Sequence, residues 1–145
     1  MPERKAFEFL EHMADIYVAA YGRTLEEAFE NAALAMVVSM TDVKKVEPKI
    51  QDIIEVKAED ECGLLYSWLE RLLIRFEVDE RLYSRFDIER IEQTAEGYAL
   101  KAKVSGEFFD PEKNPSKVGI KAVTYHQMEI ITSPRSVTLK FILDI

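Results

Sequence analysis

The sequence has few of the residues on which many catalytic and metal-binding motifs depend. It contains one cysteine, Cys62, which excludes an internal disulfide and a cysteine-rich zinc site and fits a reducing cytoplasm. Its two histidines are too few for a three-histidine zinc site. Its five glycines form neither a dinucleotide-binding fingerprint nor a phosphate-binding loop, and there is no Gly-x-Ser-x-Gly nucleophile motif. These absences argue against an ordinary stand-alone enzyme.

Basic charge and long apolar runs are also scarce. With 27 acidic residues against 19 basic ones, the net charge is -8. This balance disfavours strong direct binding of nucleic acid and favours a divalent cation or a basic protein surface as the partner. The longest purely apolar run, residues 32–38, is far shorter than the ~20 residues of a membrane-spanning helix, and the charged N-terminal segment lacks the apolar stretch of a signal peptide. We therefore expect a cytoplasmic protein that does not contact a membrane.

Length and composition predict a single domain over residues 1–145, because 145 residues with 48% apolar side chains can bury one substantial core. A Thr24-x-x-Glu27 capping box begins one amphipathic helix, and a second is expected over residues 63–76. Strands are expected at 7–10, 15–21, 51–58, 85–94, 97–109, 120–132 and 136–145. The predicted fold class is α+β, with two helices packed on one face of a largely antiparallel β-sheet.

Two acidic positions could belong to a metal site. Asp15 begins a strand, and Asp144 lies beside the terminal carboxylate of Ile145 in the last strand. If these strands are neighbours, three carboxylates converge, and such oxygen ligands select Ca²⁺, Mg²⁺ or Mn²⁺ over zinc or copper. The alternatives are that Asp15 bonds nearby backbone amides at a turn and that Asp144 is simply solvated.

The segment from Lys121 to Glu129 is a second candidate. If it is one continuous strand, alternation places Lys121, Tyr125 and Glu129 on one face and His126 on the other. A face with lysine, tyrosine and glutamate could recognise a protein partner, an anionic group or a nucleotide. The alternative is an ordinary strand with one solvated face and a hydrogen-bonded His126 at a sheet edge.

These same places carry a resemblance to a known family. The segments in question are FLEHMADI at 9–16, AYGRTLEEAF at 20–29, VGIKAVTYH at 118–126 and FILDI at 141–145. In this combination the chain resembles archease, the small protein that assists the GTP-dependent tRNA-splicing RNA ligase. The resemblance extends from Phe7 to the last residue, with Met13 where the family usually has a small hydroxyl residue.

The resemblance implies both a function and a set of residues. Archeases are not ligases; they promote guanylylation and turnover of the ligase and can broaden the nucleotides it uses. The family's metal site, usually described with calcium, falls on Asp15, Asp144 and the terminal carboxylate of Ile145. The resemblance also makes five residues candidates for the surface that meets the ligase: His12, Lys121, Tyr125, His126 and Glu129. The implied fold is the archease type of α+β domain.

Two other functions are compatible with the same residues. One is a chaperone-like modulator of another RNA-processing enzyme, such as an RNA methyltransferase. The other is a small metal-dependent hydrolase that uses Asp15 and Asp144, which the missing general-base arrangement disfavours.

Overall fold

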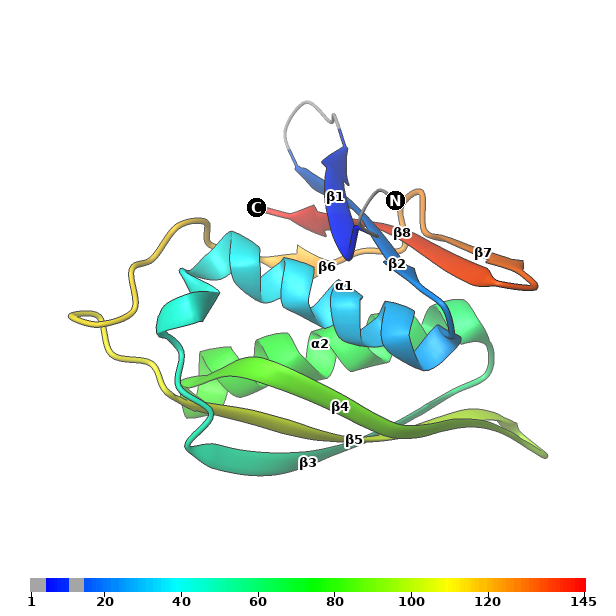
Figure 1. Ribbon diagram of the computed structural model, residues 1–145, viewed down its shortest axis with the longest axis horizontal. Helices are drawn as coiled ribbons and strands as arrows, with labels where there is room; N and C mark the ends of the chain where they lie inside the picture. The colour runs from blue at the N-terminus through cyan, green and yellow to red at the C-terminus, as the bar shows by residue number, and fades with distance from the viewer. Residues whose placement is uncertain (1–4, 11–14) are drawn as a thin grey trace.

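The computed structural model describes residues 5–10 and 15–145. Two antiparallel sheets lie on opposite sides of a pair of helices (Figure 1). The five-stranded sheet has the order β1-β2-β8-β6, with β7 also paired to β8. Its strands are β1 (Phe7–Leu10), β2 (Ile16–Gly22), β6 (Ala122–Val123), β7 (Glu129–Ser133) and β8 (Ser136–Asp144). The three-stranded sheet has the order β3-β5-β4, with β3 (Ile50–Ala58), β4 (Arg81–Thr94) and β5 (Gly97–Phe108). The α+β class is confirmed, but the single sheet expected from the sequence is two sheets.

The helix α1 (Leu25–Met40) contacts both sheets, mainly through β2 and β4. Small side chains on several of its sides make this possible, because they let a backbone approach closely. Buried alanines stand at 28, 32, 33 and 35. The expected N-terminal cap is present: the Glu27 N–H donates to Thr24 Oγ1 at 3.1 Å, while the Glu27 carboxylate accepts from the Arg23 N–H. After α1, a short 3₁₀ helix, η1 (Val43–Lys45), leads towards β3.

The helix α2 (Glu61–Asp79) is longer at both ends than residues 63–76. Its start is set by Asp60, whose carboxylate accepts from the Gly63 N–H at 2.7 Å. Its end is set by Glu80, which adopts a left-handed conformation and donates its N–H to the Phe76 carbonyl. No helix in the described part of the chain is long and apolar enough to cross a membrane.

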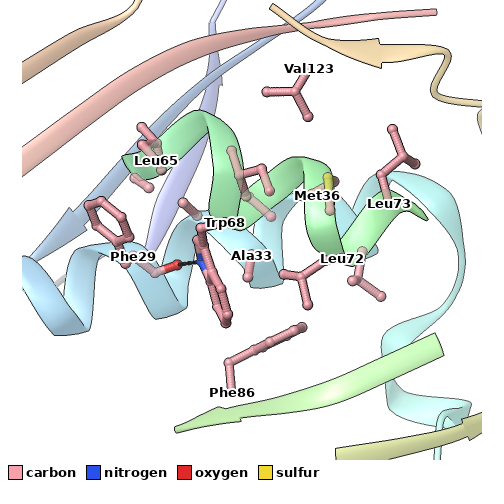
Figure 2. Packing of buried hydrophobic residues seen from close by; sticks show 14 of the residues in the cluster. Phe29, Ala33, Met36, Leu65, Trp68, Leu72, Leu73, Phe86 and Val123 are labelled. Atoms are coloured by element: carbon pink, nitrogen blue, oxygen red, sulfur yellow. Dashed lines mark hydrogen bonds between the residues drawn. The ribbon is translucent and has the colours of Figure 1, made fainter. Parts of the chain in front are cut away.

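The core is concentrated between the helices and extends to both sheets (Figure 2). Trp68 is fully buried, and its indole N–H donates to the Phe29 carbonyl on α1 at 2.9 Å. The ring of Phe86 on β4 meets Trp68 edge to face. Val123 of β6, a strand of the five-stranded sheet, belongs to the same cluster of buried side chains. One cluster of buried side chains therefore joins the two sheets.

The prediction of one continuous strand over residues 120–132 is wrong. The chain forms only β6 and β7, and between them it makes a turn closed by the Met128 N–H and the Tyr125 carbonyl at 3.1 Å. Gln127 has a φ of 54° in this turn, which an extended strand does not allow. The alternation of Lys121, Tyr125 and Glu129 onto one face therefore does not hold.

Candidate functional site

The two acidic residues expected in a metal site come from neighbouring strands. β2 and β8 are antiparallel partners, with Ile16 opposite Leu143. Extending that register by one residue sets Asp15, in the bend before β2, next to Asp144, the last residue of β8. Opposite residues of an antiparallel pair project to the same face. In Figure 1 the start of β2 and the end of the chain meet at one end of the five-stranded sheet. Both aspartates are half-buried.

A third strand fixes the other side of Asp144. Ala122 of β6 pairs with Asp144, and the Lys121 N–H donates to the Asp144 carbonyl at 2.7 Å. Lys121, one of the residues expected to meet a partner, is therefore held beside the aspartate pair by its backbone, while its side chain is exposed. This backbone bond ties the segment before β6 to the last residue of β8.

Asp15 also lines a surface groove of about 400 Å³. Its walls include Phe9 from β1, Val38 from α1, and Lys117 and Val118 from the loop before β6. This loop is attached to the end of α1, because the N–H groups of Lys117 and Val118 donate to the carbonyls of Met40 and Ser39. Sequence analysis missed Lys117, which lies in a polar loop without periodicity; only the attachment of the loop to α1 places it near Asp15.

The described residues contain no group of three His, Cys, Asp or Glu side chains able to hold a metal ion. The predicted set has a different composition, with two side-chain carboxylates and the main-chain carboxylate of Ile145. His12, one of the predicted partner contacts, lies outside the described residues. The metal ligands therefore stay a prediction, supported by the strand register.

The remaining partner candidates lie along the turn and strand that follow β6. Tyr125 stacks on Tyr66 of α2, with ring centroids 4.4 Å apart and planes 7° apart. His126 is exposed in the turn, and Glu129 pairs with Lys140 in the β7–β8 register. These residues do not share one face with Lys121, because the turn after β6 redirects the chain.

The electrostatic surroundings of the tyrosine pair are acidic. Burial raises the pKa of Tyr125, and the charges of Asp60 and Glu70 raise it further. A hydrogen bond with Glu70, one helical turn away, is the largest cause of the raised pKa of Tyr66. The sequence contained no signal that Tyr66 would meet Tyr125, because the two are far apart along the chain and only packing of α2 against the loop joins them.

Comparison with known proteins identifies relatives over nearly the whole chain. Residues 7–145 match the model of the Archease protein family (MTH1598/TM1083). The chain is 43% identical to the archease of Sulfolobus acidocaldarius, covering 96% of this chain and 98% of that protein. It is 48% identical to the archease of Thermococcus kodakarensis, covering 90% and 91%.

Two solved structures have the same fold. The solution structure of Methanobacterium thermoautotrophicum protein 1598 has a TM-score of 0.83 at 37% identity, covering 97% of this chain and 99% of that one. The crystal structure of a Thermotoga maritima archease, described as a possible chaperone, has a TM-score of 0.59 at 18% identity, covering 100% and 99%. At that identity the second similarity shows the fold alone.

Proposed function

Because this chain belongs to the archease family, we propose that it activates the GTP-dependent RNA ligase of tRNA splicing and catalyses no reaction of its own. In this role it promotes guanylylation and turnover of the ligase in the cytoplasm and broadens the nucleotides that the ligase uses. The observation that carries the proposal is the family match over residues 7–145. The net charge of -8 supports docking on a basic protein surface over direct binding of RNA.

The proposed activator holds one divalent cation at the end of the five-stranded sheet. Its ligands are Asp15, Asp144 and the carboxylate at Ile145, with Ca²⁺ the preferred ion and Mg²⁺ or Mn²⁺ as alternatives. The β2–β8 register supports this set, because it brings two carboxylates together from opposite ends of the sequence. Such close like charges are tolerated best with a cation between them, and oxygen donors suit a hard ion.

A bound divalent ion would supply neutralisation of phosphate charge where the nucleotide reacts. The residues of this chain provide the rest of the site. The hydrogen bond from Lys121 to the Asp144 carbonyl fixes the end of β8, and Lys117 contributes a cationic group to the groove that Asp15 lines. His12, Lys121, Tyr125, His126 and Glu129 stay the proposed contacts with the ligase, and Lys121 would meet it on a different face from the residues of the turn and β7.

The test is single-turnover guanylylation of the cognate ligase with GTP and divalent metal, with and without the full chain. We expect a clear rate increase that is lost in Asp15→Asn and Asp144→Asn, both verified as folded by circular dichroism. Asp87→Asn is the matched control, because Asp87 is exposed on β4 of the other sheet. Calorimetric titration with Ca²⁺ should show binding to the wild type and to the control, and much weaker binding to the two variants.

The outcomes separate the parts of the proposal. No stimulation by the wild type would contradict the activator role, and co-purification with an RNA methyltransferase would then identify the other candidate partner. Stimulation that survives in both aspartate variants would contradict the metal site but leave the activator role intact.

A further inference from the structure

The stacked pair of Tyr66 and Tyr125 forms an aromatic surface outside the carboxylate site. Tyr125 is 56% exposed although its ring is parallel to that of Tyr66. One ring face is therefore occupied within the protein, while much of the side chain faces solvent. An exposed aromatic ring that is already held in one orientation loses little conformational freedom when a ligand stacks on it.

The backbone around Tyr125 accounts for this orientation. The turn that contains it is closed by the bond from the Met128 N–H to the Tyr125 carbonyl. The preceding residue, Thr124, is tied to β8 because its N–H and its hydroxyl both donate to the Ile142 carbonyl, at 3.3 and 2.9 Å. The ring is thus presented by a segment anchored on both sides.

Carboxylates border the ring pair. An ideal Cβ on Gly63 would lie 3.1 Å from Asp60 Oδ1 and 3.8 Å from the Tyr125 hydroxyl oxygen, so both groups lie over the first turn of α2. Glu70 is next to Tyr66, with which it hydrogen-bonds. Burial raises the pKa of the neighbouring Cys62 thiol, and the charges of Asp60 and Glu61 raise it further. We call Asp60, Tyr66, Glu70 and Tyr125 the tyrosine–acid patch.

We propose that the tyrosine–acid patch binds an arginine side chain of the protein partner. A guanidinium is attracted to the face of an aromatic ring, and its planar set of N–H donors matches a carboxylate. A phosphate would be repelled by the same carboxylates, so a protein ligand is favoured over a nucleic acid. The chain contains an internal example of this ring chemistry, since the Arg81 guanidinium lies 4.3 Å from the centroid of the Phe108 ring. The inference rests on the proposed function only in that the chain acts by docking on another protein.

The first test uses short peptides as probes and does not require the ligase. The full chain is titrated with acetyl-Gly-Arg-Gly-amide and with the same peptide carrying citrulline, which keeps the shape of arginine but has no charge. NMR spectra of the Tyr66 and Tyr125 rings follow binding. We expect saturable shifts of both rings with the arginine peptide, and at least fivefold weaker binding of the citrulline peptide.

Variants identify the groups responsible. Tyr125→Ala should weaken binding of the arginine peptide by about two- to fivefold, the range of an exposed cation–π contact. Tyr125→Phe should bind like the wild type, because the ring is retained, and Glu70→Gln should bind more weakly. Phe108→Ala is the matched control. The exposed fraction of Phe108 is 55%, similar to that of Tyr125, but the Phe108 ring already faces Arg81. Equal binding of the arginine and citrulline peptides, or an unchanged affinity of Tyr125→Ala for the arginine peptide followed at the Tyr66 ring, would overturn the proposal.

A second test connects the patch to the ligase. In the guanylylation assay, Tyr125→Ala should raise the concentration of the chain needed for half-maximal stimulation by about two- to fivefold and leave the maximal rate unchanged. Tyr125→Phe should restore the wild-type concentration dependence. If the wild type does not stimulate the ligase but the arginine peptide still binds, the proposed function fails while the patch stands. If the ligase is stimulated and Tyr125→Ala changes nothing in either assay, the patch proposal fails alone.

Discussion

The two sheets on either side of the helices are assembled in different ways. The three-stranded sheet comes from one continuous region, residues 50–108, and β4 and β5 are joined directly by the turn that links Thr94 to Gly97. The five-stranded sheet joins the two ends of the sequence, because β2 lies between β1 and β8 and pairs with both (Figure 1). The candidate carboxylate site lies only in the second kind of sheet.

This difference shows why the carboxylate site depends on the complete fold. A hairpin brings neighbouring residues together at a low entropic cost, whereas pairing β2 with β8 closes a loop of most of the chain. The proximity of Asp15 and Asp144 therefore depends on a contact between residues far apart in the sequence. The following predictions test how far the two sheets depend on one another.

The largest effect is expected for Trp68→Ala. Trp68 is fully buried between the helices and bonds the Phe29 carbonyl, so its removal should cost about 3–5 kcal/mol of unfolding free energy. Because α2 contacts strands of both sheets, we expect both sheets to unfold in one transition in urea. Circular dichroism and hydrogen exchange of the β5 and β8 amides measure this transition. Trp68→Phe, which keeps a ring, should cost less. Loss of protection in β8 while β5 stays protected would show that the sheets are independent.

A smaller effect is expected for Gly106→Ala on β5. A Cβ at Gly106 would overlap the Leu82 carbonyl oxygen and come within 2.6 Å of Tyr83 Cα, at a place where the backbones of β4 and β5 approach closely. Forcing these strands apart should cost about 1–3 kcal/mol. The control is Gly119→Ala in the loop before β6, where a Cβ would meet nothing within 4 Å and stability should change by less than about 1 kcal/mol. Similar unfolding free energies for the two variants would contradict this contrast.

The smallest effect concerns the ion pairs that tie the end of β5 to the following loop. Lys113 Nζ lies 2.9 Å from Glu107 Oε1 and 3.0 Å from Glu47 Oε2. The Glu107 side chain is only 10% exposed, so Lys113→Met should lower the unfolding free energy, by less than either substitution above. Lys49→Met is the control, because the pair of Lys49 with Glu47 is exposed on both sides and its loss should change the unfolding free energy less than Lys113→Met does.

The same pair predicts a pH dependence. Burial pushes the pKa of Glu107 upward, but the hydrogen bond from the Glu47 N–H and the Lys113 ammonium bring it below its ordinary value. A lowered pKa means that the folded state favours the ionised group, so this contribution is present above the unfolded pKa and is lost as pH falls through the folded pKa. Unfolding measured from pH 7 to pH 3 should show a smaller decline in Lys113→Met than in the wild type. An equal decline in both would indicate that Lys113 does not set the pKa of Glu107.

Much of the fold could be predicted from local patterns. The Thr24 cap, the apolar spacing of α1 and the β4–β5 hairpin all depend on residues close together in sequence, and each is present. The prediction of a strand over residues 120–132 is wrong because the same alternation of side-chain types is also compatible with a turn. Nothing in the local sequence indicates that Gln127 takes a left-handed conformation, with a φ of 54°.

The sequence alone determined the kinds of chemistry available: acidic residues at Asp15 and Asp144, an acidic surface, and no cysteine or histidine cluster. It also determined the archease resemblance, which the family match confirms. Only the tertiary structure decided which side chains are neighbours. Asp144 lies beside Asp15 through strand register, Lys117 lies in the Asp15 groove through the end of α1, and Tyr125 lies on Tyr66 through packing against α2. The physical reason is that side-chain type is a local property, whereas proximity between distant residues comes from burying one core that all these elements share.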